Sequence, residues 1–380
     1  MVRRPTVATV SLPALQANVR AISAMIAREH DRSRTAPAII AVVKANAYGH
    51  GAASVGLALE AAGVAMLACA DIEEGVTLRE AGVTIPILVF GALSVSDLAG
   101  VFTHQLTPTV STPGAAVALE AAAAARGVRL ACHLKIDTGM NRLGFRHDNL
   151  RRMLPPVLSS PHLSFDAVYT HFATADDAES PFLEEQRSRF DLASAAIGAL
   201  GARGLRRHAA NSAAFLRDRR TWYDWVRPGL LLYGLVPPPL AAADLGLCPA
   251  LSLASRIVAV KGIRAGEGIG YGLRWTTDRP ATIAIVPAGY ADGLDTRASG
   301  RTSVLIRGRR APIVGSVCMD MIAIDVTGHE VSTGDEVVLI GRQGDDEISA
   351  REIAAAIGSI PWEVLCRLGS RVERLYSTDN

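Results

Sequence analysis

The sequence lacks any long apolar run. No stretch of its 380 residues is apolar for long enough to span a bilayer. The alanine-rich segment from Ala115 to Ala125 carries Glu120 and is followed by Arg126-Gly127, which predicts a helix that ends there. The basic N-terminus has no apolar region behind it, so no signal peptide is expected. A membrane is therefore not an expected partner.

An excess of charge of one sign and a pattern of paired cysteines are also missing. Lys and Arg number 39 and Asp and Glu 37, and the resulting net charge of +2 gives no reason to expect a nucleic acid as partner. The cysteines are odd in number and scattered, with neither zinc spacing nor a disulfide framework. They favour a reducing, cytoplasmic location and no metal site. The five are Cys69, Cys132, Cys248, Cys318 and Cys366.

What is present is globular composition, with 49% hydrophobic and 20% charged residues. Between residues 38 and 235, short apolar runs alternate with helical patterns, which is typical of βαβ units around a parallel sheet. The number of repeats favours a (β/α)₈ TIM-type barrel, whose catalytic residues would lie at the C-terminal ends of the strands. Predicted strands are Ile39–Val43, Ala65–Ala70, Ile85–Phe90, Arg129–Ile136, Phe165–Thr170 and Leu230–Tyr233; predicted helices are Ala52–Ala61, Ile72–Glu80, Pro113–Ala125 and Leu183–Ala199.

Composition changes at Val236-Pro-Pro-Pro239, which predicts a semi-rigid linker. Beyond it the chain is β-rich, and Ser349-Ala-Arg-Glu352 predicts a capping box at the start of a final helix. We therefore expect a barrel domain over residues 1–240 and a mostly β domain over residues 246–380. The first strand, Val7–Val10, is an alternative member of the second domain.

Lys44 is the first candidate for chemistry. It ends the apolar run Ala38–Val43 and precedes a glycine-containing turn. A lysine at the mouth of a buried strand is partly desolvated and can form a Schiff base, although most lysines that end strands are merely solvated.

Several motifs that occur in a fixed order along the chain favour a catalytic Lys44 over a merely solvated one. The string A-V-V-K-A-N-A-Y-G-H-G around Lys44 resembles the pyridoxal 5'-phosphate (PLP) lysine motif of alanine racemases. K-I-D-T-G-M-N-R-L-G, from Lys135 to Gly144, resembles a second motif of that family, and H-F-A-T-A-D at His171 a third. N-S-A-A at Ser212, R-P-G-L from Arg227, G-I-G-Y-G-L-R-W around Tyr271, A-G-Y-A-D-G around Tyr290 and C-M-D at Met319 complete the series.

The resemblance implies a role for each of these residues. Lys44 and Tyr271 would be the two catalytic bases, one on each face of the substrate α-carbon. Arg142 would approach the cofactor and the substrate carboxylate, Tyr290 would line the substrate entrance, and the Met319 N–H would meet the carboxylate. Lys135 would be carbamylated in many members, and would then orient Arg142. The phosphate of PLP would be held by Tyr48, Ser212, Gly229, Leu230 and Tyr376. Barrels of this type often bind phosphate in the loops after their last two strands, which agrees with the positions of Ser212, Gly229 and Leu230.

Arg227 would decide the type of reaction. In the family this arginine faces the ring nitrogen of PLP. Arginine has a pKa above about 12, so it donates a hydrogen bond without giving up its proton. The ring then stays a weak electron sink, which favours racemisation over transamination. Its positive charge, relayed through His171, would stabilise a Tyr271 phenolate.

The resemblance also implies a homodimer in which Tyr271, Tyr290 and Met319 come from the second subunit. The enzyme would interconvert L- and D-alanine, for peptidoglycan synthesis or for alanine catabolism in a bacterium. The sequence departs from the family pattern at Asp295-Thr-Arg297 and at Met321, both expected near the entrance. A racemase for serine or for a broader set of amino acids therefore stays open. A decarboxylase of the same fold and a non-catalytic PLP carrier fit less well.

Overall fold

The computed structural model describes residues 4–91, 93, 96–242 and 245–378. The chain divides into two compact units. One comprises residues 15–47 and 52–248, and the other comprises the described residues up to Ala14, residues 48–51 and residues 249–378. This division differs from the predicted boundaries, which placed residues 48–51 in the barrel domain.

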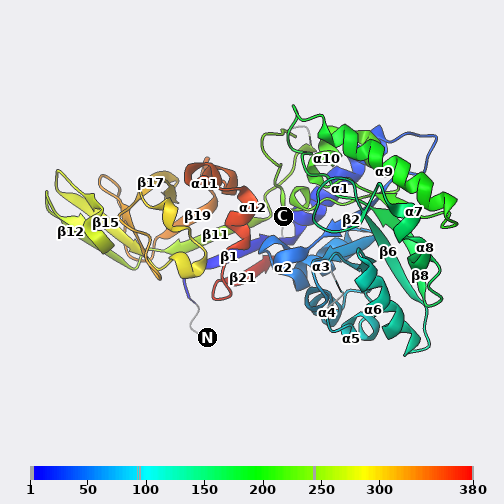
Figure 1. The fold of residues 1–380 in the computed structure, drawn as a ribbon. Helices are drawn as coiled ribbons and strands as arrows, with labels where there is room; N and C mark the ends of the chain where they lie inside the picture. Colours follow the sequence, from blue (N-terminus) through cyan, green and yellow to red (C-terminus); the bar gives the residue numbers. More distant parts are fainter. Residues whose placement is uncertain (1–3, 92, 94–95, 243–244, 379–380) are drawn as a thin grey trace. The chain divides into compact units, whose positions relative to one another are not determined.

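The first unit is a closed (β/α)₈ barrel, which confirms the predicted fold class. Eight parallel strands pair in a ring that closes between β10 and β2, and a short ninth strand, β7 (Phe145–Arg146), pairs with β6. Helices surround the strands, as Figure 1 shows for α3, α6, α8 and α9. The barrel strands are β2 (Ala38–Val42), β3 (Met66–Cys69), β4 (Ile87–Val89), β5 (Thr107–Val110), β6 (Leu130–Asp137), β8 (Leu163–Tyr169), β9 (Arg206–His208) and β10 (Trp225–Val226).

The helices of this part of the chain are α1 (Leu12–Glu29), α3 (Ala52–Ala61), α4 (Ile72–Glu80), α5 (Ala99–Thr103), α6 (Pro113–Ala124), α7 (Leu150–Met153), α8 (Pro155–Leu158), α9 (Phe182–Ala199) and α10 (Ser212–Arg217), with 3₁₀ turns η1 (Arg219–Thr221) and η2 (Leu230–Tyr233). Side-chain caps fix several starts: Asp71 caps α4, Thr112 caps α6 and Asn211 caps α10. No helix of the described residues is both long enough and apolar enough to cross a membrane.

One predicted strand is wrong. Leu230–Tyr233 forms the 3₁₀ turn η2, and most of it is buried. A short, buried apolar run has the same pattern in a strand and in a helical turn, so periodicity cannot separate them. The strand that completes the barrel there is instead the two-residue β10, which was not predicted. The sequence did not predict β5, which contains Pro108, or the basic β9, because neither segment is an apolar run.

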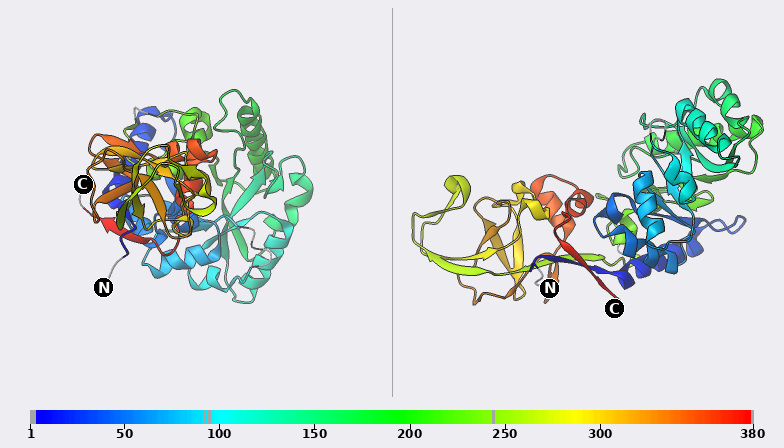
Figure 2. Two further views of the ribbon diagram at one scale, coloured as in Figure 1. Left: turned by 90° about the vertical axis from the view of Figure 1, so that its left-hand side faces the viewer. Right: turned by 90° about the horizontal axis from the view of Figure 1, so that it is seen from below.

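The second unit is built on a ten-stranded sheet in the order β12-β15-β18-β17-β16-β19-β11-β1-β21, with β20 paired to β19. The N-terminal strand β1 (Val7–Ser11) lies antiparallel to β11 and parallel to β21, as Figure 2 shows in dark blue beside red. The other strands of the sheet are β11 (Leu251–Arg256), β12 (Ala259–Ile263), β15 (Ala281–Val286), β16 (Ser303–Ile306), β17 (Arg309–Val314), β18 (Ile322–Asp325), β19 (Glu336–Gln343), β20 (Asp346–Ile348) and β21 (Glu373–Ser377). A separate two-stranded sheet pairs β13 (Gly268–Ile269) with β14 (Trp275–Thr276).

Helices α11 (Ala350–Ile357) and α12 (Pro361–Cys366) follow the sheet. Ser349 caps α11 by accepting from the Glu352 N–H at 3.1 Å, which confirms the predicted helix start. In a capping box the Glu352 carboxylate would accept from the Ser349 N–H; here it pairs with Arg310. The helix is also not the last one, since α12 follows it.

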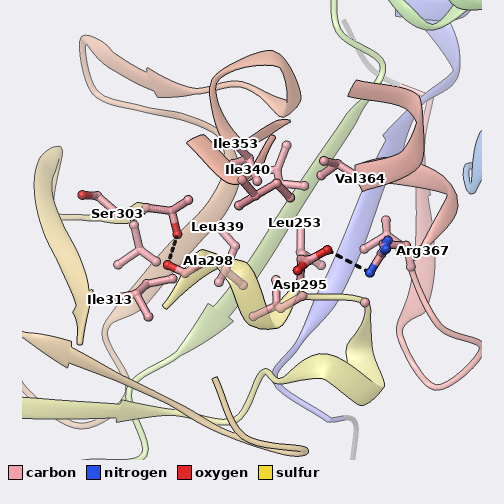
Figure 3. Close-up of a pocket in the computed structure, with 16 residues that line it drawn as sticks. Leu253, Asp295, Ala298, Ser303, Ile313, Leu339, Ile340, Ile353, Val364 and Arg367 are labelled. Carbon is pink, nitrogen blue, oxygen red and sulfur yellow. Dashed lines mark hydrogen bonds and ion pairs between the residues drawn. The ribbon is translucent and has the colours of Figure 1, made fainter. Parts of the chain in front are cut away.

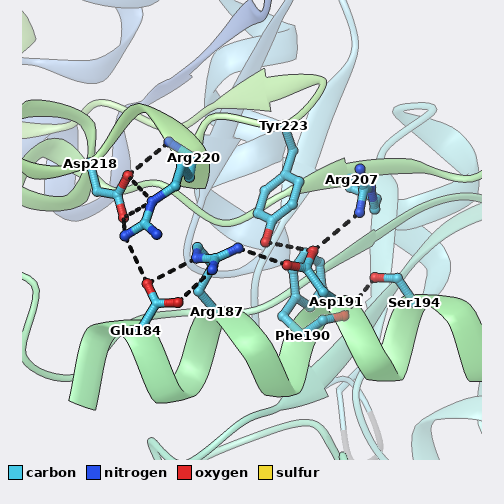
Figure 4. A network of polar contacts seen from close by, with 9 residues as sticks. All are labelled: Glu184, Arg187, Phe190, Asp191, Ser194, Arg207, Asp218, Arg220 and Tyr223. Carbon is cyan, nitrogen blue, oxygen red and sulfur yellow. Dashed lines mark hydrogen bonds and ion pairs between the residues drawn. The ribbon is translucent and has the colours of Figure 1, made fainter. Parts of the chain in front are cut away.

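A polar network ties α9 to β9 and to the segment that precedes β10 (Figure 4). Asp191 on α9 accepts from the Tyr223 hydroxyl at 3.0 Å, from Arg187 at 2.9 Å and from Arg207 at 3.3 Å. Arg220 joins Glu184 and Asp218 at the other end.

We expect Asp191→Asn to lower the free energy of unfolding by about 1–2 kcal/mol without changing kcat, because it removes a charge that serves three donors. Denaturant unfolding measures the change. Asp148→Asn is the control, since its pair with Arg146 is solvent-exposed and contributes little. Equal effects of the two substitutions would contradict a stabilising role of the network.

Candidate active site

Lys44 lies two residues beyond the end of β2, at the C-terminal mouth of the barrel strand, and is half-buried. The segment α2 (Lys44–Tyr48) that follows is a left-handed turn, in which Ala45, Asn46 and Ala47 have φ of 54°, 52° and 55°. Left-handed helical backbone costs an L-residue roughly 1–2 kcal/mol. The chain therefore leaves β2 through a strained turn that begins at Lys44, which is typical of functional sites.

Four further predicted residues meet at the same end of the barrel. Lys135 and His171 line one small cleft together with Arg142. Arg227, directly after β10, places Nη2 at 3.4 Å from His171 Nδ1. Burial first, and then the positive charges of Arg227, Lys135, Arg142 and Lys44, hold the pKa of His171 well below its ordinary value. The site is thus a cluster of cations around a neutral imidazole, and it is suited to an anion.

A chain of histidines behind Arg227 was missed in the sequence. Arg227 Nη1 lies 2.9 Å from His208 Nδ1, and His208 Nε2 lies 3.1 Å from His133 Nδ1. Because a guanidinium can only donate, His208 must accept at Nδ1 and donate from Nε2 to His133. Burial lowers the pKa of His133 to about 3 and that of His208 well below its ordinary value, so both rings are neutral.

Two backbone carbonyl groups also hold the Arg227 side chain in place. Its Nη2 donates to the carbonyl oxygens of Thr170 at 2.7 Å and Ala209 at 2.9 Å. Burial lowers its pKa to about 10, below the value expected from the sequence but still well above neutrality. Arg227 is therefore a rigid, buried cation whose acceptors are neutral, and no acidic side chain is among these four contacts.

Of the residues predicted to bind a phosphate, Ser212 contacts Gly229, which Leu230 follows in the chain. The buried Ser212 hydroxyl accepts from the N–H of Gly229 at 3.0 Å and of Leu231 at 3.4 Å. Asn211 caps the helix that Ser212 begins. Because both N–H groups donate to the hydroxyl oxygen, the Ser212 O–H is left as a donor that suits an anionic oxygen.

Tyr48 and Tyr376, the other residues predicted to contact the phosphate, both belong to the second unit, which we call the β unit. Arg374 on β21 donates to the Gly49 carbonyl at 3.1 Å. A Cβ at Gly51, where φ is 96°, would lie 1.9 Å from the Tyr376 hydroxyl, and one at Gly49 would lie 2.2 Å from the Leu365 carbonyl. These two glycines let residues 48–51 lie against α12 and β21, and this is why the segment clusters with the β unit.

Tyr271, Tyr290 and Met319 occupy three linked loops of the β unit. Tyr271 begins the 3₁₀ turn η4 (Tyr271–Leu273), and its carbonyl accepts from Ser316 at 3.0 Å. Tyr290 begins η5 (Tyr290–Asp292), and its N–H donates to Cys318 at 2.9 Å, while the Ala291 N–H donates to the Met319 carbonyl at 3.1 Å. The three side chains are 78%, 45% and 52% exposed.

An ion cluster that the sequence did not reveal fixes two of these loops. Asp292 is fully buried and pairs with Arg4 at 2.9 Å and with Arg371 at 2.8 Å. Arg371 also reaches Asp320 at 2.7 Å, and the Asp292 carboxylate accepts from the Gly289 N–H at 2.8 Å. The loop that carries Tyr290 and the loop that carries Met319 therefore share a common anchor.

The divergent segment Asp295-Thr-Arg297 forms η6 (Thr296–Ala298) with its cap, and Asp295 and Ala298 line an apolar pocket of the β unit (Figure 3). Asp295 is 8% exposed and pairs with Arg367 at 2.9 Å and with Arg297 at 2.7 Å. Hydrogen bonds from Arg297, and then the charge of Arg367, lower the pKa of Asp295 to about 2. Asp295 thus anchors the C-terminal end of α12 through Arg367.

Lys135 is 6% exposed in β6. Burial, followed by the charges of Arg142 and Arg227, lowers its pKa to about 8 from 10.5. Between these two pH values the unfolded chain holds a proton that the folded chain has lost, so stability rises with pH across this window. Below pH 8 both states hold the proton, and the buried ammonium lowers the free energy of unfolding by an amount that no longer changes with pH. A neutral amine near pH 8 can also react with carbon dioxide.

We expect the free energy of unfolding to rise from pH 8 to pH 10.5 by up to about 3 kcal/mol more in the unmodified protein than in Lys135→Met, at about 1.4 kcal/mol per pKa unit. Urea titrations over this pH range measure the difference. Lys261→Met is the matched control, since Lys261 is exposed and is the one lysine outside this site among the three of the chain. Parallel pH curves for all three proteins would contradict the buried ammonium.

These observations define the class of protein. A closed (β/α)₈ barrel gathers a lysine amine, buried cations and a buried serine hydroxyl at the C-terminal ends of its strands, and this is where barrel enzymes bind and transform small anionic molecules.

Comparisons with known proteins specify the family. Residues 10–237 match the family model of the alanine racemase N-terminal domain, and residues 250–376 match that of the C-terminal domain. The alanine racemase of Symbiobacterium thermophilum is 42% identical over 374 residues, covering 98% of this chain and 97% of its own. That of Halothermothrix orenii is 40% identical over 376 residues, covering 99% and 97%.

Solved structures agree. The alanine racemase of D-cycloserine-producing Streptomyces lavendulae superimposes with a TM-score of 0.93 at 34% identity, covering 100% of this chain and 99% of its own. That of Bacillus anthracis with bound L-Ala-P gives 0.91 at 36% identity, covering 100% and 96%. The chain belongs to the alanine racemase family.

Proposed function

We propose that the protein interconverts L- and D-alanine with PLP as cofactor, and that Lys44 and Tyr271 are its two bases. The observation that supports this most strongly is the cluster at the barrel mouth, where Lys44 stands among Lys135, Arg142, His171 and Arg227. Related proteins over the whole length of the chain bear the name alanine racemase, and the Bacillus anthracis relative binds L-Ala-P.

The residues fit PLP. The acceptors of the buried Arg227 are neutral, so its positive charge and those around it would be stabilised by the anionic oxygens of PLP. The Lys44 amine would bind the aldehyde, and Ser212, Gly229 and Leu230, with Tyr48 and Tyr376, would bind the phosphate. When bound, PLP supplies a conjugated ring that stabilises the negative charge left when a proton leaves the substrate α-carbon.

The reaction itself needs two proton carriers. Inversion at the α-carbon requires a base on each face of the carbon, each able to return the proton that the other removed. Lys44 serves one face, taking the proton from D-alanine, and Tyr271 serves the other, taking it from L-alanine. Arg142 and the Met319 N–H hold the substrate carboxylate, and Tyr290 lines the entrance.

Arg227 sets the outcome of proton removal. A group with a pKa of about 10 keeps its proton near neutrality, so Arg227 would offer the cofactor ring nitrogen a hydrogen bond and not a proton. By keeping its proton, Arg227 would favour return of a proton to the α-carbon over transamination or loss of carbon dioxide. The neutral His208–His133 chain keeps the guanidinium in this orientation.

The active form is a homodimer in which the β unit of one copy completes the site of the other. The exposure of Tyr271, Tyr290 and Met319 supports this arrangement, as does that of Leu273 and Met321 beside them. The enzyme acts in the cytoplasm, where its five free cysteines stay reduced.

The test is to incubate the PLP-loaded protein with L-alanine and L-serine separately in D₂O, following the enantiomer ratio and α-deuterium together. Alanine should become racemic and gain α-deuterium, and serine should react slowly. Equal rates would move the assignment to a broad-specificity racemase. No exchange with either amino acid would refute racemisation and favour a carrier or a decarboxylase.

A further inference from the structure

The left-handed turn after Lys44 is held from outside by one acidic side chain, Glu74. Glu74 lies in the first turn of α4, where its own N–H donates to the cap Asp71 at 2.9 Å. Its Oε1 accepts from the Ala45 N–H at 2.6 Å, and its Oε2 accepts from the Ala70 N–H at 2.8 Å. Ala45 follows β2 and Ala70 follows β3, so one carboxylate joins the ends of two adjacent strands.

The bonded Ala45 N–H belongs to the peptide group that links Lys44 to Ala45. Fixing that peptide plane fixes ψ of Lys44, since the plane contains the Lys44 carbonyl. Four non-glycine residues in a row, Ala45 to Tyr48, take left-handed backbone there, which is intrinsically unfavourable, so the turn depends on contacts that hold it. Such conformations persist only where surrounding contacts over-determine them.

Two other contacts define the far side of the turn. The Asn46 side chain accepts from the Ala52 N–H at 2.8 Å, at the start of α3, and the Ala47 N–H donates to the Val43 carbonyl at 2.8 Å. Glu74 is thus the contact on the Lys44 side of the turn. Both of its oxygens accept backbone N–H groups, which suits a fixed support rather than a proton carrier.

We propose that Glu74 is a positioning residue that sets the direction of the Lys44 side chain by holding the left-handed turn. This inference rests on the proposed function of Lys44. The chemistry of the contact makes it specific to glutamate. A glutamine has one acceptor oxygen, so its NH₂ group would face a second N–H donor, and an aspartate is one methylene too short.

The experiment compares Glu74→Gln with Glu73→Gln. Glu73 is the adjacent residue of the same helix, is exposed, and undergoes the same change of charge. We expect Glu74→Gln to lower kcat by roughly 10–100-fold with little change in KM, because a small misplacement of a reacting group has effects of this size. Glu73→Gln should behave as the unmodified protein.

A second readout does not depend on activity. In cofactor-free protein, amide hydrogen exchange of a peptide covering residues 44–49 should be faster in Glu74→Gln and unchanged in Glu73→Gln. Adding Ala45→Gly to Glu74→Gln should recover part of the lost kcat, because glycine takes φ near 54° without a steric cost and the Ala45 side chain is exposed. General destabilisation of α4 would not be rescued at position 45.

Wild-type kcat and wild-type exchange in Glu74→Gln would overturn the proposal, as would a loss of kcat that Ala45→Gly leaves unchanged while exchange at residues 44–49 stays normal. If the unmodified protein does not racemise alanine, the proposed function fails. The exchange comparison still decides whether Glu74 holds the turn.

Discussion

Tyr271→Phe is expected to lower kcat for racemisation by about 10²–10⁴-fold, the range for loss of a positioned acid–base group, while PLP binding stays normal. The substitution removes one hydroxyl and leaves the loop intact. The Tyr271 carbonyl keeps its bond from Ser316, and the left-handed glycines Gly270 and Gly272 keep the η4 turn. The side chain is 78% exposed, so folding of the chain does not depend on it.

The loss should be uneven between the two directions of proton transfer. With Tyr271 gone, Lys44 can still exchange the α-proton of D-alanine with solvent, whereas exchange from L-alanine should nearly stop. Measurement of α-deuterium in each enantiomer separately shows this difference. Tyr290→Phe, which removes a hydroxyl from a neighbouring exposed loop, should change KM and leave kcat within a few-fold. Wild-type turnover in Tyr271→Phe would refute the two-base assignment.

The barrel was predictable because its longer strands are apolar runs separated by helical patterns. The runs at β2, β3, β6 and β8 satisfy this rule. β9 and β10 do not, because Arg206–His208 is polar and Trp225–Val226 has only two residues. Their strand geometry comes from pairing within the closed ring, which is a tertiary effect that no local pattern encodes.

The site was predictable only where its residues form sequence motifs. Lys44, Lys135, His171 and Arg227 are far apart in sequence, and the barrel brings them to the C-terminal ends of its strands, with Arg142 in the loop after β6. Their supports were not predictable. Glu74 looks like any acidic residue in the first turn of a helix, and Asp292 looks like an ordinary turn residue until Arg4 and Arg371 meet it from distant parts of the chain.

Lys44→Ala is expected to abolish turnover, with a loss of roughly 10⁴–10⁶-fold, because one side chain is both the attachment point of the cofactor and one of the two bases. The chain has only three lysines, so borohydride reduction followed by peptide mass analysis can assign the attachment unambiguously. The label should fall on Lys44 and disappear in the variant. Lys261→Ala is the control and should keep both label and rate. A label on Lys135 or Lys261 would refute the assignment.

Mixing the two inactive variants tests whether the site is shared between subunits. If Lys44 of one copy works with Tyr271 of the other, a mixed dimer of Lys44→Ala and Tyr271→Phe chains contains one site with both bases intact and one with neither. Random exchange at equal concentrations makes half of the dimers mixed, so about one quarter of the wild-type rate should return. If both bases came from the same chain, every site would lack one base. Mixing would then restore nothing, and the exposed Tyr271 would need another explanation.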